Sequence, residues 1–239
     1  MVNRYFKAYT LDEFDRFIRN FNFTRPINHI QIHHTWKPRK TDYQGEKTIE
    51  AIWRYHTETR GWSDIGEHFT ISPDGLIWDG RDLNVIPAGI SGHNIGGMMF
   101  EMIGNFDKGQ EVLEGKQLDS ILGAVNIMLD HLNLTTVDIV FHREYANKTC
   151  PGSGITKDWF IAQINKWKEE HWQVKGEIPL PFKDLTPKHW AYPSIKRLYD
   201  IGIITGTSQD QFGTGQPLKR EDAAVLLDRL LQYLEKQKD

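Results

Sequence analysis

The segment from Ile139 to Gly152 holds the two residue types best suited to binding a soft divalent metal. An apolar, β-branched run ends at His142, and Cys150, the single cysteine of the chain, follows in the next loop. The run predicts a strand, and the Pro-Gly pair after the cysteine predicts a turn. An imidazole and a thiolate held together by a short loop are good ligands for zinc.

A metal site needs a third ligand, and a second predicted strand offers one. The segment from Ile30 to Thr35 reads Ile-Gln-Ile-His-His-Thr, a strand pattern that ends in histidine. Side chains alternate along a strand, so only one of His33 and His34 can face a common site, and spacing alone does not choose. A structural interpretation stays open, because a lone cysteine is more often a small buried apolar residue than a ligand.

An acid inside an apolar strand is the best candidate for acid–base chemistry. The run from Met98 to Ile103 predicts a central strand, and Glu101 lies within it. A carboxylate in such a place is costly unless it is paired or functional. Glu101 is therefore the candidate general base on physical grounds.

The elements that must position these residues are readable from periodicity. Apolar residues at helical spacing predict helices over 10–18, 48–59, 114–133 and 156–172, the first opened by a Thr10–Glu13 capping box. Strands are expected over 68–71 and 76–78, joined by a Ser-Pro-Asp-Gly turn.

Bulk properties exclude several classes of protein. A net charge of −3 argues against a nucleic-acid-binding protein. No apolar run reaches the roughly 18–20 residues that span a bilayer, which argues against a membrane partner. The N-terminal residues lack the apolar core of a signal peptide, so we expect synthesis in the cytoplasm, with secretion by another route still open. One cysteine excludes an internal disulfide.

Residues 25 to 170 resemble the zinc amidase family that includes amidase-type phage lysozymes and the peptidoglycan recognition proteins. The motifs that carry the resemblance are His-His-Thr, Trp-x-Asp-Ile-Gly-x-His-Phe, His-Arg-Glu and Lys-Thr-Cys-Pro-Gly. It implies an α/β fold, with a mixed central sheet flanked by helices. It also implies Zn²⁺ held by His33, His142 and Cys150, Glu101 as general base, and Lys148 as the group that stabilises the oxyanion. His34 is then a structural neighbour.

Two positions depart from the family pattern or align loosely with it. Glu67 stands where some phage enzymes carry a catalytic tyrosine, and it could line the cleft or be an exposed strand residue. Whether Glu67 or Glu101 is the main base also stays open. His93 precedes the central strand in a Gly-rich loop, and we expect it to border the cleft. His56, on a predicted helix, is expected to be structural.

The chain divides into residues 1–173 as the catalytic domain, 174–181 as a linker and 182–239 as a wall-binding domain. The linker is marked by a glycine and two prolines. Residues 182–234 resemble one S-layer homology module, two helices around a short loop, which implies binding to secondary cell-wall polysaccharide. Lys219 and Glu221 depart from the usual signature. The alternative is a helical hairpin that serves only to dock on the first domain.

These resemblances imply a peptidoglycan hydrolase that cleaves the amide bond between N-acetylmuramic acid and L-alanine. We expect a bacteriolytic, antimicrobial enzyme of the phage or prophage endolysin kind, which reaches the cell wall after the membrane is permeabilised. Two alternatives remain: a noncatalytic peptidoglycan-binding protein, and a zinc peptidase that cuts within the stem peptide.

Overall fold

The computed structural model describes residues 4–172, 180–187 and 189–236. The chain forms two compact units, Met1–Lys175 and Gly176–Asp239. Residues 174–179 of the expected linker lie outside the described residues. None of the helices in the described part of the chain is long and apolar enough to cross a membrane.

The first unit is built on a six-stranded sheet of order β1-β4-β3-β5-β2-β6. Strand β2 pairs in parallel with β5 on one side and β6 on the other, and β3 pairs in parallel with β5. Strands β1 and β4 add an antiparallel edge, so the expected mixed sheet is confirmed. The strand bounds are Ala8–Tyr9 for β1, His29–His34 for β2, Phe69–Ile71 for β3, Ile77–Asp79 for β4, Gly97–Met102 for β5 and Ile139–Phe141 for β6.

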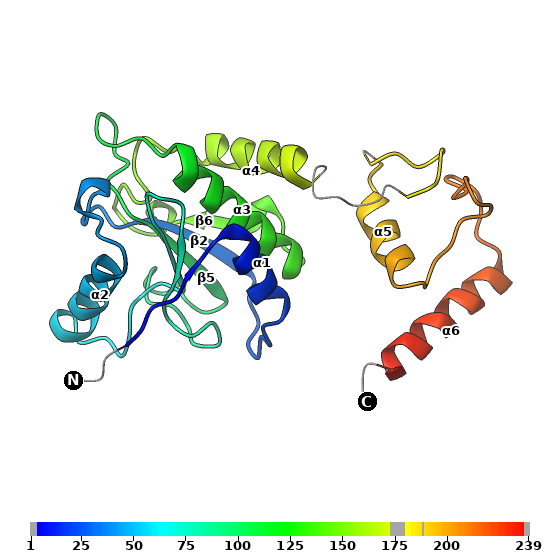
Figure 1. Ribbon diagram of the computed structural model, residues 1–239, viewed down its shortest axis with the longest axis horizontal. Coiled ribbons are helices and arrows are strands. Elements are labelled where there is room, and N and C mark those ends of the chain that lie inside the picture. Colours follow the sequence, from blue (N-terminus) through cyan, green and yellow to red (C-terminus); the bar gives the residue numbers. More distant parts are fainter. Residues whose placement is uncertain (1–3, 173–179, 188, 237–239) are drawn as a thin grey trace. The chain divides into compact units, whose positions relative to one another are not determined.

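Helices cover both faces of this sheet (Figure 1). Helices α1, α3 and α4 pack on the face that carries the main core, and α2 lies against the other face. A single π-helical turn extends α2. The bounds are Leu11–Arg19 for α1, Glu46–Arg54 for α2, Tyr55–Thr59 for the π-helical turn, Gly115–His131 for α3 and Lys157–Trp172 for α4.

Local signals in the sequence fix several of these element ends. The capping box predicted for α1 is confirmed: the Glu13 amide donates to the Thr10 hydroxyl oxygen, and the Thr10 amide donates to the Glu13 carboxylate at 2.8 Å. The strand expected from Val137 onward begins only at Ile139. Thr136–Asp138 instead form a 3₁₀ turn, because the Asp138 carboxylate accepts the Thr135 amide proton and closes the chain on itself.

Alternation along β2 and β5 separates the core from the site. Ile30 and Ile32 lie in the main core, with Met98, Phe100 and Met102 of β5. The residues between them point to the opposite face, where Gln31 lies beside Met99 and His33 beside Glu101 in the strand register. One face of the same two strands therefore stabilises the fold, and the other presents polar groups.

The second unit contains the two predicted helices, α5 (Tyr192–Asp200) and α6 (Arg220–Lys236). The segment between them, 201–219, is long, whereas the sequence predicted a short loop. The core of the second unit is small. It consists of Leu180, Phe182, Leu185 and Ile195, with Ala191, Tyr192, Tyr199 and Phe212 partly buried around them.

Candidate metal centre and catalytic cleft

Three side chains from distant parts of the sequence converge beside the sheet. The ligand atoms of His33, His142 and Cys150 all lie within 4.8 Å of one another. The Cys150 Sγ is 3.6 Å from His33 Nδ1. In a tetrahedral zinc site with bonds of roughly 2.3 Å to sulfur and 2.0–2.1 Å to nitrogen, sulfur and nitrogen are about 3.6 Å apart. The three predicted ligands are therefore placed close enough to bind one metal ion.

Parallel strand pairing brings the two histidines together. His33 lies near the carboxyl end of β2, and His142 follows directly after the neighbouring β6. The carboxyl ends of adjacent parallel strands meet at one edge of a sheet, where ligands commonly bind. The two imidazole rings are 4.8 Å apart, centroid to centroid.

A single guanidinium organises the loop that carries the thiol. Arg143 donates from its backbone amide to the Cys150 carbonyl oxygen at 3.0 Å. Its guanidinium donates to the carbonyl oxygens of Thr149, at 3.1 Å, Gly152, at 2.8 Å, and Ile155. These four carbonyls belong to Cys150 itself and to residues on both sides of it in the loop. Arg143 therefore fixes the position of Cys150 beside the histidines.

Burial keeps all three ligands neutral until a cation arrives. It raises the pKa of the Cys150 thiol to about 12 and lowers the pKa of His142 to about 4. The pKa of His33 falls well below its ordinary value, chiefly through burial and then through His142. The imidazoles are thus ready to ligate, while the thiol must release its proton to the solvent when a divalent ion binds.

His34 belongs to the packing around the site. Its imidazole Nδ1 accepts the Phe106 backbone amide at 3.3 Å, and burial lowers its pKa to about 4. Its own backbone amide donates to the Cys150 sulfur at 3.4 Å, a contact that favours the thiolate. His34 therefore supports the centre without being one of the three converging ligands.

The metal centre opens into a cavity of about 470 Å³. A second cavity of about 620 Å³ adjoins it and shares Thr35, Trp36, His56 and Glu101 with it. The first cavity is lined by His33, His34, Thr35, Trp36, His56, Trp62, Gly66, Ala88, Gly89, Met99, Glu101, His142, Lys148, Thr149 and Cys150. Glu101 and Lys148, predicted from the sequence, thus share one cavity with the ligands.

Glu67 and Glu101 form a pair of carboxyl groups behind the metal centre. The two carboxyl groups shift each other's pKa, and Glu67 accepts from the Thr70 hydroxyl at 2.9 Å. Burial raises the pKa of Glu101 well above its usual range, and the Glu67 carboxylate raises it further. Glu67 is fully buried and, among the described residues, is not one that lines either cavity. Glu67 is therefore not an exposed strand residue, and its carboxyl group lies against Glu101.

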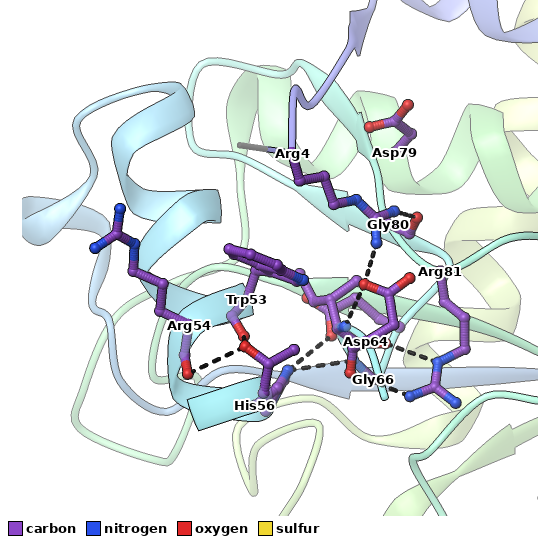
Figure 2. Close-up of polar contacts among 12 residues, drawn as sticks. Arg4, Trp53, Arg54, His56, Asp64, Gly66, Asp79, Gly80 and Arg81 are labelled. Carbon is purple, nitrogen blue, oxygen red and sulfur yellow. Dashed lines mark hydrogen bonds and ion pairs between the residues drawn. The ribbon is translucent and has the colours of Figure 1, made fainter. Parts of the chain in front are cut away.

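Polar contacts hold the segment from Asp64 to Gly66, which directly precedes Glu67 in the sequence, as Figure 2 shows. Arg4 forms an ion pair with Asp64, and Arg81 donates to the Asp64 carbonyl oxygen at 3.2 Å. The Gly66 amide donates to His56 Nδ1 at 3.2 Å. These contacts position the residues immediately before Glu67 against the end of α2.

His56 is a cleft residue that the sequence analysis assigned to structure alone. It lines both cavities, stacks on Trp62 at 4.7 Å between ring centroids and lies 3.8 Å from the Glu67 carboxylate. Burial lowers the pKa of His56 to about 4, so its ring is neutral and Nδ1 accepts the Gly66 amide. Its helical spacing placed it on one face with Ile52, and that face borders the second cavity.

His93 lies at the rim of the site. Its side chain is exposed and its ring is 3.9 Å from that of Tyr145, between ring centroids. Of the described residues that line the two cavities, none is His93. Its backbone carbonyl, however, accepts a hydrogen bond from Gln31 inside the site.

Comparisons with known proteins agree with this geometry. The chain is 29% identical over 159 residues to an N-acetylmuramoyl-L-alanine amidase of Sus scrofa, an alignment that covers 63% of this chain and 25% of the relative. It is 26% identical over 148 residues to peptidoglycan-recognition protein SC2 of Drosophila melanogaster, covering 59% of this chain and 76% of the relative. The match to the pig protein thus spans only a quarter of that relative's length.

Structural comparison gives the same fold. The structure of Drosophila PGRP-LB matches with a TM-score of 0.51 at 27% identity, covering 62% of this chain and 84% of that one. The S-layer homology domain profile matches residues 181–224. The profile described as N-acetylmuramoyl-L-alanine amidase matches residues 23–153, more than half of the sequence. The chain therefore belongs to the N-acetylmuramoyl-L-alanine amidase family.

Proposed function

We propose that this protein is a zinc-dependent hydrolase that cleaves the amide bond between N-acetylmuramic acid and L-alanine in peptidoglycan. The observation that carries the proposal is the convergence of His33, His142 and Cys150 on a cavity that also contains a carboxyl group and a lysine. Two imidazoles and a thiolate leave one tetrahedral position of zinc open, as catalytic zinc sites do. Membership of the amidase family supports the choice of bond.

The residues of the chain would divide the chemistry between them. Zinc would polarise the scissile carbonyl and lower the pKa of the attacking water. Glu101 accepts the proton of that water and returns it to the leaving amide nitrogen. Lys148, which lines the same cavity, stabilises the negative charge that develops on the carbonyl oxygen.

Glu101 is the better choice of base because it can reach the substrate. It lines both cavities, whereas Glu67 is fully buried behind it. Two carboxyl groups in contact hold one proton between them over a wide pH range. The pKa of Glu101 is raised further by the Glu67 carboxylate, so the shared proton resides on Glu101 before a cation binds. A metal ion bound in the same cavity would favour ionised Glu101 and leave the proton to Glu67, and we assign Glu67 this supporting role.

The second unit would hold the enzyme on its substrate. The match of residues 181–224 to the S-layer homology domain supports binding to secondary cell-wall polysaccharide through residues 182–234. A hydrolase joined to a wall-binding unit suits a bacteriolytic enzyme, and we propose the setting of a phage or prophage endolysin that acts after the membrane is permeabilised.

Product analysis on purified cell walls tests the proposal. The protein with zinc should clear a suspension of Gram-positive walls, and a chelator should stop it. Mass spectrometry should find new L-alanine N-termini together with intact lactyl groups on the sugar. Cuts inside the stem peptide would instead indicate a zinc peptidase. A protein that pellets with walls while turbidity stays constant would be a noncatalytic binder.

A further inference from the structure

Two buried polar atoms beside the metal centre lack hydrogen-bond partners among the described residues. They are His33 Nε2 and Gln31 Oε1. Gln31 is 0% exposed and His33 2% exposed, and both point to the same face of β2. A buried polar atom without a partner is costly, so two of them on one strand face call for an explanation.

The position of the thiol decides which His33 nitrogen carries a proton. Nδ1 is the nitrogen that faces the Cys150 sulfur at 3.6 Å, so Nδ1 is the atom that can ligate a metal. A neutral imidazole that ligates through Nδ1 carries its proton on Nε2. His33 Nε2 is therefore a hydrogen-bond donor that needs an acceptor.

The Gln31 amide has a fixed orientation. Its Nε2 donates to the His93 backbone carbonyl at 2.9 Å and lies 3.1 Å from His29 Nε2. A carbonyl oxygen only accepts hydrogen bonds, so a flipped amide would place two acceptors against each other. Gln31 Oε1 must then be the atom turned toward the metal centre, and it is an acceptor that needs a donor.

Gly89 shows that these two atoms border one small space. A Cβ on Gly89 would lie 2.8 Å from Gln31 Oε1 and 2.9 Å from His33 Nε2. Only a residue without a side chain leaves that space free. A small rotation of the imidazole, or one bridging water, would join the donor to the acceptor.

We propose that Gln31 is a positioning residue of the metal centre: its amide oxygen accepts the Nε2 proton of His33 and so holds Nδ1 toward the metal. The hydrogen bond fixes both the tautomer and the orientation of the ring. Through the His93 carbonyl, Gln31 also ties the centre to the Gly-rich loop at the cleft rim. This inference rests on the proposed zinc site, because without a metal the ring has no reason to be held.

The test compares two buried glutamines. Gln117, like Gln31, is fully buried, its amide donates to two acceptors, and its Oε1 has no partner among the described residues. Gln117 belongs to α3, in the main core, and does not line the cleft. Gln31→Met and Gln117→Met therefore remove the same group, once beside the metal centre and once away from it.

Zinc affinity is measured by competition with a chromophoric chelator, and the site is probed by the absorption bands of Co²⁺ in place of zinc. Gln31→Met should bind zinc about 10–100-fold more weakly than wild type, with shifted cobalt bands, as is typical when the partner of a ligating histidine is removed. Gln117→Met should keep wild-type affinity and spectrum.

Gln31→Glu would be protonated in this fully buried place, so that one oxygen accepts from His33 while the O–H donates to the His93 carbonyl. Its zinc affinity should therefore stay within about threefold of wild type. If the Met variant does not fold, the Glu variant carries the test, and a loss beyond tenfold overturns the proposal. Equal zinc affinity and equal cobalt spectra for Gln31→Met and Gln117→Met also overturn it, while leaving the hydrolase intact. Failure of the wild-type protein to bind zinc at all would overturn both.

Discussion

The two units place their polar groups in opposite ways. In the first unit, β2 holds Gln31 and His33 away from solvent on one face of the sheet, and the segment before β3 holds Glu67 fully buried. In the second unit, the half-buried carboxylate of Asp184 accepts hydrogen bonds from the backbone amides of the long loop that leads to α6. The first arrangement raises the pKa of buried carboxyl groups, whereas the second lowers the pKa of Asp184 and closes a loop.

The two units also differ in what their apolar residues do. The main core of the first unit joins the sheet to three helices. In the second unit α6 leaves Leu227, Leu231 and Leu234 largely exposed, and the unit's core is built without them. We therefore expect changes at the metal centre to alter chemistry and leave the first unit folded, and changes in the loop of the second unit to alter its stability.

The largest effect is expected from the metal ligand on β2. His33→Ala should abolish bound zinc and reduce hydrolysis of soluble muropeptide by about a thousandfold or more, because the metal contributes several kcal/mol of charge stabilisation. His34→Ala is the matched control, one position along the same strand, and should retain most of the zinc. Metal content after dialysis and turnover of muropeptide measure both. The reverse pattern would mean that the other face of the strand ligates the metal.

The next largest effect is expected from substitution of Glu101, the acid on β5. Glu101→Gln should lower kcat by about 10²–10⁴-fold, the usual contribution of a general base. Zinc should stay bound at wild-type stoichiometry, since Glu101 is not one of the three converging ligands. Steady-state kinetics with parallel metal analysis separates the two. Full activity in this variant would remove Glu101 from the mechanism.

The difference between the units can be tested by separating them. A chain that ends at Lys175 should hydrolyse soluble muropeptide as the full chain does, while its retention on intact walls should fall about a hundredfold, as when one of two linked binding modules is lost. Co-sedimentation with walls and turnover of soluble substrate give the two readouts. Equal retention with and without the second unit would exclude a targeting role.

Much of the first unit followed from the sequence because its signals are local. Strand alternation predicted that only one of His33 and His34 can face a common site, and only His33 is among the three converging ligands. The contact between Glu67 and Glu101 could not be predicted in this way. It depends on β3 pairing with β5, which sets Thr70 beside Glu101, and periodicity within one segment carries no information on that pairing.

The second unit shows the same limit. Its two helices were expected from the resemblance to an S-layer homology module, and both are present. The same resemblance predicted a short loop between them, whereas the observed loop is long and is organised by a residue far away in the sequence. The Asp184 carboxylate accepts a hydrogen bond from the Phe212 amide at 2.7 Å, and no sequence pattern around either residue predicts that contact.

A smaller effect, on the pH dependence of the reaction, is expected from the substitution Glu67→Gln. Burial raises the pKa of Glu101 first, and the charge of Glu67 raises it further. Glu67→Gln removes that charge, so the pKa of Glu101 should fall and the acid limb of the pH–rate profile should move to lower pH. Profiles of kcat between pH 4 and pH 8, about the range in which such groups titrate, would show it. An unmoved acid limb would mean that the two carboxyls do not interact during turnover.

The smallest effect concerns the stability of the second unit in acid. Hydrogen bonds from the Phe212, Thr214 and Gly213 amides lower the pKa of Asp184 to about 2. A carboxyl group whose pKa is lower in the folded state stabilises the fold above its unfolded pKa of about 3.9, and this stabilisation is lost as pH falls toward the folded value.

Asp184→Asn should therefore weaken the second unit at pH 7, and the difference from wild type should shrink as the pH falls from about 4 to about 2. The urea midpoint, followed through the amide NMR signals of Phe212, Gly213 and Thr214, measures it residue by residue. Asp210→Asn is the control, since Asp210 is equally exposed but pairs with the Lys183 side chain, and an exposed ion pair contributes little. If both variants lose the same stability at pH 7, the loop is held by general charge balance and not by the Asp184 carboxylate.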